Sequence, residues 1–139
     1  MSAPIFVATD FSEYSAKATM MGLRLAAVLN APLLLVHVVE PVGDPNQADK
    51  EILAFHEQLL EEGQRKMQLE LQRWSGDREA ATMIEIGHRV PTLLRLINEQ
   101  QPAMVVMGSR LRDLHRIGIS LEVLLQCPYP VLLVPHHVE

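Results

Sequence analysis

Apolar residues along this chain fall into two patterns, short runs and longer stretches with helical spacing. Five short runs predict strands, at residues 4–9, 33–39, 80–86, 103–107 and 129–134. The run at 33–39 is too apolar throughout to leave one face in water, as expected for a strand in a buried parallel sheet. Between the runs, apolar residues recur at three- and four-residue steps, which predicts amphipathic helices. The alternation indicates an α/β domain with a parallel sheet covered on both faces.

The first of four predicted helices begins after the N-cap Ser12 and ends at Asn30, and the second spans about residues 47–74. The third carries Pro91 in its first turn and ends before Pro102, and the fourth follows the loop at 110–116. Each helix is expected to turn one apolar face toward the sheet. In the first helix this face is Ala18, Met21, Leu25 and Val28, and in the second it is Ile52, Phe55, Leu59, Gly63, Met67, Leu71 and Trp74. In the third helix it is Leu93, Leu94 and Ile97, and in the fourth it is Leu114, Ile117, Leu121, Leu124 and Leu125.

Five strands in this order suit a single three-layer domain, residues 1–139, with a doubly wound sheet of flavodoxin-like or closely related strand order. The last strand is bracketed by Pro130 and Pro135, which predicts that it lies at the edge of the sheet. The ends of the first and fourth strands should be neighbours at the switch point. That placement would bring residues 9–12 next to residues 107–109 and form a crevice.

Composition narrows the class of protein. A length of 139 residues fits one domain, and 48% hydrophobic with 21% charged residues is ordinary for a globular fold. We expect a cytoplasmic protein without membrane contact, because no apolar run approaches the ~20 residues that span a bilayer and the N-terminus does not resemble a signal peptide. The net charge of −5 argues against nucleic acid as a partner. The single cysteine, Cys127, lies in an apolar stretch and is expected to be a buried thiol.

The candidate chemistry is concentrated after the fourth strand, where Gly108-Ser109 is followed by Arg110, Arg112 and Arg116. Backbone N–H groups face outward at the carboxyl end of a buried strand, so this basic loop suits an anion such as phosphate. The alternative is that Gly108 only permits a tight turn and the arginines are solvated. Asp10 has a similar pair of interpretations, a ligand contact or an acceptor for N–H groups at the turn into the helix.

Further polar residues are better explained by structure. Ser12 is a helix cap, and His37 is expected to be a satisfied strand-end histidine. The chain has no Gly-x-Ser-x-Gly elbow, no Gly-x4-Gly-Lys-(Ser/Thr) loop and no cysteines with metal-ligand spacing. A phosphoacceptor signalling domain would need an aspartate closing the third strand, where Ile86-Gly87 stands. We therefore expect no catalytic activity.

Two stretches together resemble the universal stress protein family, and the similarity covers nearly the whole chain. The first is Val-Ala-Thr-Asp-Phe-Ser at residues 7–12 with the strand ending His-Val-Val-Glu-Pro at 37–41. The second is Val-Val-Met-Gly-Ser-Arg at 105–110 with Cys-Pro-Tyr-Pro-Val-Leu-Leu-Val at 127–134. The resemblance implies an adenine nucleotide alpha hydrolase-like fold with five parallel strands. It also implies a homodimer joined through the last strand, by Val131, Leu132, Leu133 and Val134.

Family members that bind ATP carry Gly-x2-Gly-x9-Gly-(Ser/Thr) after the fourth strand, and this chain departs from that pattern. Gly108 matches the first glycine, but Leu111 occupies the second position. Gly118 is the best match for the third glycine, in a shorter loop, and is followed by Ile119 with Ser120 one place later. A leucine obstructs the approach of backbone N–H groups to phosphate, and a shorter loop has fewer donors.

The resemblance therefore implies a small stress-response regulator, non-catalytic and homodimeric, whose altered crevice binds ATP weakly or not at all, with no metal beyond magnesium carried by the nucleotide. The alternative is an ATP- or AMP-binding module, or a slow ATPase, in which arginines of loop 110–116 contact phosphate. The resemblance implies that the nucleotide crevice is formed by Ala8, Thr9, Asp10, Val39, Met107, Gly108, Ser109, Arg110, Gly118 and Ser120.

Overall fold

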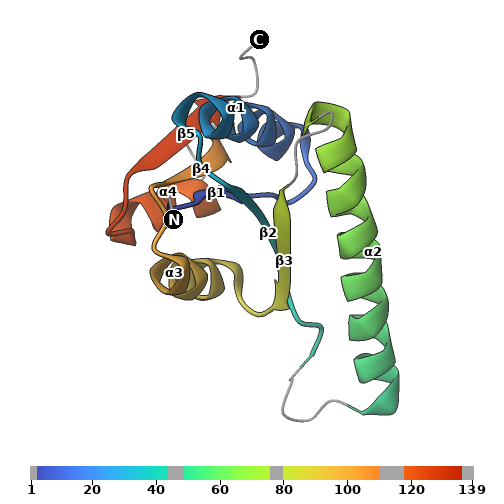
Figure 1. Cartoon of the computed structure of the whole chain (residues 1–139). Coiled ribbons are helices and arrows are strands. Elements are labelled where there is room, and N and C mark those ends of the chain that lie inside the picture. The colour runs from blue at the N-terminus through green and yellow to red at the C-terminus, as the bar shows by residue number, and fades with distance from the viewer. Residues whose placement is uncertain (1–2, 44–48, 76–79, 110–117, 136–139) are drawn as a thin grey trace.

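The computed structural model describes residues 3–43, 49–75, 80–109 and 118–135. The strands are β1 (Ile5–Ala8), β2 (Leu33–Val39), β3 (Ala81–Ile86), β4 (Met104–Ser109) and β5 (Val131–Pro135). The helices are α1 (Glu13–Leu29), α2 (Lys50–Ser75), α3 (Arg89–Gln100) and α4 (Ile119–Gln126). Figure 1 shows three layers, with α1 and α2 on one face of the sheet and α3 and α4 on the other. The fold class expected from the alternating pattern is confirmed.

The sheet is parallel and has the strand order β3-β2-β1-β4-β5. Ile5 of β1 lies opposite Leu33 of β2 on one side and Met104 of β4 on the other. The direction of winding reverses between β1 and β4, so the expected switch point is confirmed. The last strand lies at the edge of the sheet, as its flanking prolines predict.

The ends of α1 follow from two residues. The Ser12 side chain accepts a hydrogen bond from the Ser15 N–H at 3.3 Å, which satisfies one of the unpaired donors of the first turn. Asn30 closes the helix in the left-handed conformation, with φ 52°, which asparagine tolerates better than most residues. Both boundaries are those expected from the sequence.

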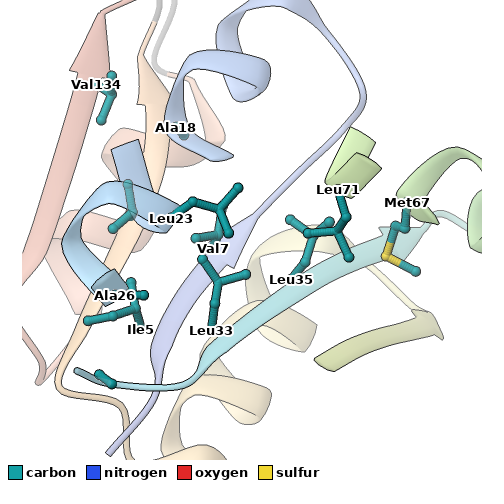
Figure 2. Packing of buried hydrophobic residues seen from close by; sticks show 12 residues of the cluster. Ile5, Val7, Ala18, Leu23, Ala26, Leu33, Leu35, Met67, Leu71 and Val134 are labelled. Atoms are coloured by element: carbon teal, nitrogen blue, oxygen red, sulfur yellow. The ribbon is translucent and has the colours of Figure 1, made fainter. Parts of the chain in front are cut away.

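The core consists of two clusters, one on each face of the central strands. On the face covered by α1 and α2, side chains of β1 and β2 meet Leu23 and Ala26 of α1 and Met67 and Leu71 of α2 (Figure 2). Gly63 of α2 lies so close to the sheet that an added Cβ would collide with Ile84, so the missing side chain permits this approach of the helix. This contact fixes how α2 lies over β2 and β3.

Some residues that were predicted to face the sheet are exposed. Val28, Phe55, Leu124 and Leu125 are exposed by 81%, 45%, 39% and 75%, whereas His56 and Val123 are buried. The helices α1, α2 and α4 therefore pack on faces displaced from the predicted ones at these positions, whereas the face predicted for α3, with Leu93, Leu94 and Ile97, is confirmed. The cause in α1 is its nearly continuous apolar sequence, within which the sheet selects the small residues Gly22 and Ala26.

The N-terminal part of α2, to which the exposed Phe55 belongs, extends past the end of β3 (Figure 1). Leu114 and Ile117 lie outside the described residues. Cys127, expected to be buried, is half-buried. Within the described ranges, no helix is both long enough and apolar enough to cross a membrane.

Candidate functional site

The carboxyl ends of β1 and β4 lie side by side, and the turn after β1 packs directly against β4. A Cβ added to Gly108 would collide with the Tyr14 carbonyl and come within 2.8 Å of the Ser15 nitrogen. The predicted proximity of residues 9–12 and 107–109 is therefore confirmed. The absence of a side chain at Gly108 is already required by contact with the backbone of α1.

Asp10 holds a fixed carboxylate at this edge. Its Oδ1 accepts hydrogen bonds from the Ser12 N–H and from the Ser15 hydroxyl, both at 2.9 Å. Burial raises the pKa of Asp10, but hydrogen bonds from the Ser12 side chain, the Ser12 N–H and the Ser15 hydroxyl, together with the nearby charge of Arg89, outweigh burial, so the pKa lies below its usual value. The site therefore offers an ionised acceptor, suited to hydroxyl or amino groups of a ligand.

Phe11, the next residue, adopts the left-handed conformation, with φ 65°. This conformation is unfavourable for a bulky residue and is retained only where the surroundings impose it. The Phe11 N–H donates to Thr9 Oγ1 at 3.1 Å, and the ring packs on His37 with 4.3 Å between centroids. The Lys66 ammonium lies 5.7 Å from the ring centroid. The strained turn directs the chain away from β2 immediately after Asp10.

That departure leaves backbone groups of β2 unpaired at the carboxyl edge of the sheet, where the crevice is expected. The Thr9 N–H donates to the Val36 carbonyl at 2.8 Å, so Val36 directs its backbone groups toward β1. Backbone directions alternate along a strand, hence Val38 faces the same side. The groups that would continue the ladder to Val38 are used elsewhere, since the Thr9 carbonyl contacts His37 and the Phe11 N–H donates to the Thr9 hydroxyl. Val38 therefore presents one donor and one acceptor beyond the end of β1.

The sequence resemblance placed Val39, and not Val38, at the crevice. The backbone groups of Val39 face β3 instead. The Gly87 N–H donates to the Val39 carbonyl at 2.9 Å, on the side of β3. Its side chain is buried, with 7% exposed. Sequence reasoning missed Val38 because the distinction depends on strand register, which no local pattern in residues 33–39 reveals.

His37 is the satisfied strand-end histidine that we expected. Its Nδ1 lies 2.8 Å from the Thr9 carbonyl, which only accepts, so Nδ1 carries a proton and donates. Burial lowers the pKa of His37, and the charges of Arg89 and Lys66 act in the same direction. The ring is therefore neutral near pH 7 and fastens β2 to the end of β1.

A second carboxylate, that of Glu70, contacts the turn from α2. Glu70 of α2 accepts a hydrogen bond from the Thr9 hydroxyl at 2.9 Å, and that hydroxyl lies 3.1 Å from the Ser15 Oγ. Burial raises the pKa of Glu70, although hydrogen bonds from Thr9 and Thr19 partly offset it. Nothing in the sequence pattern pointed to Glu70, which is separated from Thr9 by 61 positions.

The β4 side of the crevice is less elaborate. Met107 and Ser109 of β4, like Ala8 of β1, have buried side chains and can offer only backbone groups to a ligand. Gly118 is the exposed N-cap of α4, without a side-chain cap, and among the described residues a Cβ there would meet only the Ser120 Oγ, at 3.9 Å. Arg110 and the other arginines of the loop lie outside the described residues. In the described part of the chain, no three histidine, cysteine or acidic side chains are grouped as a metal site.

The fold of this chain is similar to that of several solved structures. The chain is similar in structure to the universal stress protein UspA from Lactobacillus plantarum, with a TM-score of 0.78, 17% identity, and 96% of this chain and 99% of that chain covered. It is similar to a universal stress protein in complex with cAMP, with a TM-score of 0.67, 20% identity and coverage of 96% and 98%.

A third similar structure is the universal stress protein from Archaeoglobus fulgidus in complex with dAMP, with a TM-score of 0.64, 18% identity and coverage of 94% and 95%. A search of curated proteins finds no match. The model of the universal stress protein family matches residues 1–135, nearly the full chain. The chain therefore belongs to the universal stress protein family.

Proposed function

We propose that the protein is a non-catalytic cytoplasmic regulator in a stress response, with a crevice that binds adenine nucleotide weakly and gains little from the outer phosphates of ATP. The observation that carries this proposal is the ionised Asp10 carboxylate, held in place through Oδ1 at the switch point. A carboxylate oxygen is a good acceptor for ribose hydroxyls and a poor neighbour for phosphate. The nucleoside half of a ligand therefore fits beside β1.

The backbone of Val38 supports an adenine base in particular. One N–H and one C=O beyond the end of β1 complement the ring-nitrogen acceptor and the exocyclic amino donor of adenine. Two proteins of similar fold have been solved with the adenine nucleotides cAMP and dAMP, which is consistent with this assignment. The base would lie between β2 and the turn at Phe11.

The β4 side supports weak binding of the phosphates. Gly108 is used by packing against α1, and Leu111 replaces the second glycine of the ATP-binding pattern. Gly118 retains open space at the start of α4, where backbone N–H groups can approach an anion. Magnesium would enter only with a nucleotide that carries it.

Titration calorimetry with adenosine, AMP, ADP and ATP tests the proposal. We expect AMP and ATP to bind with dissociation constants within about tenfold of each other, a difference of about 1.4 kcal/mol. Micromolar ATP binding, far tighter than AMP, would contradict the weak phosphate half. In that case the double variant Arg110→Ala, Arg112→Ala would decide whether the arginines supply the affinity, as the alternative of an ATP-binding module requires.

The homodimer is proposed to form through β5. In the described sheet this strand pairs with β4 on one side only, and Leu132 is 38% exposed. Val134 is buried within the protomer, so it would contribute its backbone edge and not its side chain. An open apolar edge is prone to pair with another strand, and a second copy satisfies it symmetrically.

Light scattering at micromolar concentration should give the mass of a dimer for the native protein and of a monomer for Leu132→Lys. Leu53→Lys is the matched control, because Leu53 is also exposed but lies on α2, on the opposite side of the molecule (Figure 1). A native protein that scatters as a monomer would contradict the assembly.

A further inference from the structure

Two carboxylates, Asp10 at the crevice and Glu70 on α2, are joined by two hydroxyl groups. Glu70 contacts the Thr9 hydroxyl at 2.9 Å, Thr9 Oγ1 and Ser15 Oγ are 3.1 Å apart, and the Ser15 hydroxyl contacts Asp10 Oδ1 at 2.9 Å. The Thr9 oxygen also accepts the N–H of Phe11, the residue in the left-handed conformation. The shape of the turn therefore depends on a hydroxyl whose direction Glu70 sets.

The surroundings of Glu70 come from three elements. Thr9 and Asp10 follow β1, Thr19 of α1 contributes a hydroxyl, and Lys66 and Arg73 lie one turn away on α2. Asp10 raises and Arg73 lowers the pKa of Glu70, while burial remains the largest influence and raises it. Glu70 is therefore more easily protonated than an exposed glutamate.

We propose that Glu70 is a positioning residue of the crevice, and that a proton is taken up at Glu70 when an anionic nucleotide binds. The second part rests on the proposed nucleotide binding. When Glu70 is ionised, the Thr9 hydroxyl donates to it. When Glu70 is protonated, its own O–H donates to Thr9, and the Thr9 proton turns toward Ser15 Oγ, which in turn donates to Asp10.

The coupling is electrostatic. A phosphate on the β4 side of the crevice adds a negative charge whose field reaches Glu70, which opposes the ionised form of Glu70 and draws a fraction of a proton from the buffer. A neutral nucleoside adds no such charge. Uptake should therefore accompany cAMP and not adenosine, and cAMP has the further advantage that its phosphodiester does not titrate in this pH range.

Calorimetry of cAMP and adenosine binding in buffers of different ionisation enthalpy measures the uptake. We expect fractional proton uptake with cAMP, and an affinity about threefold higher near pH 5.5 than near pH 7.5. Glu70→Gln, which keeps the shape and an acceptor for Thr9, should abolish both effects. Glu61→Gln is the control, since Glu61 is an exposed glutamate on the same helix. Equal uptake in the native protein and in Glu70→Gln would overturn the linkage.

A ligand-free measurement tests the positioning role by itself. The amide NMR signals of Phe11 and Ser12 should shift with the titration of Glu70, and the shift should be absent in Glu70→Gln and in Thr9→Val but present in Thr9→Ser. Titration of the Phe11 amide that is unchanged in Glu70→Gln would refute the positioning role. If cAMP does not bind at all, the proposed function and the linkage both fail, and the NMR result still decides the positioning role.

Discussion

The two strands that meet at the switch point end in different ways. β1 ends in a turn held by the side chains of Thr9, Asp10 and Ser15, with a strained Phe11 in its middle. In β4 the next-to-last residue, Gly108, is pressed against the backbone of α1. The first ending fixes an acceptor for a ligand, whereas the second is explained by packing. A crevice with one elaborated side should recognise a nucleoside and hold its phosphates loosely.

The largest expected effect comes from Gly108→Ala. The new methyl group would collide with the Tyr14 carbonyl, and a backbone contact cannot yield as a flexible side chain can. Overpacking costs typically 1–3 kcal/mol and more when the obstacle is rigid, so we expect a loss of about 3 kcal/mol in the free energy of unfolding. Urea denaturation measures it.

Gly118→Ala is the matched control, because in the described part of the chain that Cβ would meet no atom closer than 3.9 Å and its φ of −76° suits any residue. We expect less than about 0.5 kcal/mol of change in stability. The comparison would break if Gly108→Ala were as stable as the native protein, because then packing would not explain that glycine.

A smaller effect is expected from Asp10→Asn at the β1 side. The amide keeps one acceptor for the Ser12 N–H but loses the charge offered to ribose hydroxyls. Loss of a charged hydrogen bond weakens binding by about 1.5–3 kcal/mol, so AMP affinity should fall roughly tenfold to a hundredfold. Calorimetry of AMP and of 2′,3′-dideoxy-AMP with both proteins measures it. A similar loss for the dideoxy compound would show that Asp10 does not contact the ribose.

Much of the scaffold follows from the sequence. Continuous apolar runs identify the five strands, because a parallel sheet buries both faces of its central strands. The cap Ser12 and the stop at Asn30 have local signatures, and Asp10 is recognisable because it directly follows a buried strand. These features depend on residues that are close together in the sequence, so they can be predicted from the sequence alone.

The remaining features depend on register and distance. Val38 and Val39 are both valines, and only the pairing of β2 with β1 and β3 decides which one faces the crevice. In the sequence Glu70 looks like the other glutamates of a charged helix. Only the packing of α2 on the sheet shows that it contacts Thr9. Phe55 shows the same limit, since helical spacing cannot reveal where the sheet beneath a helix ends.

The smallest expected effect concerns pH, and it sharpens the comparison because His37 lies beside the end of β1 while Met107, Gly108 and Ser109 carry no titratable side chain. The folded pKa of His37 is lowered, so the unfolded chain binds more protons as the pH falls below about 6.5. The free energy of unfolding should therefore decrease in that range.

His37→Asn isolates this effect, since the amide can still donate to the Thr9 carbonyl but does not titrate. Glu70 acts in the opposite direction, because its raised pKa makes the folded state bind more protons and gain stability as the pH falls toward about 4.5. The two contributions partly cancel in the native protein. In a Glu70→Gln background, the protein with His37 should lose stability on acidification relative to His37→Asn, as measured by urea denaturation at several pH values. A difference that is constant with pH would mean that His37 is not held neutral at the end of β1.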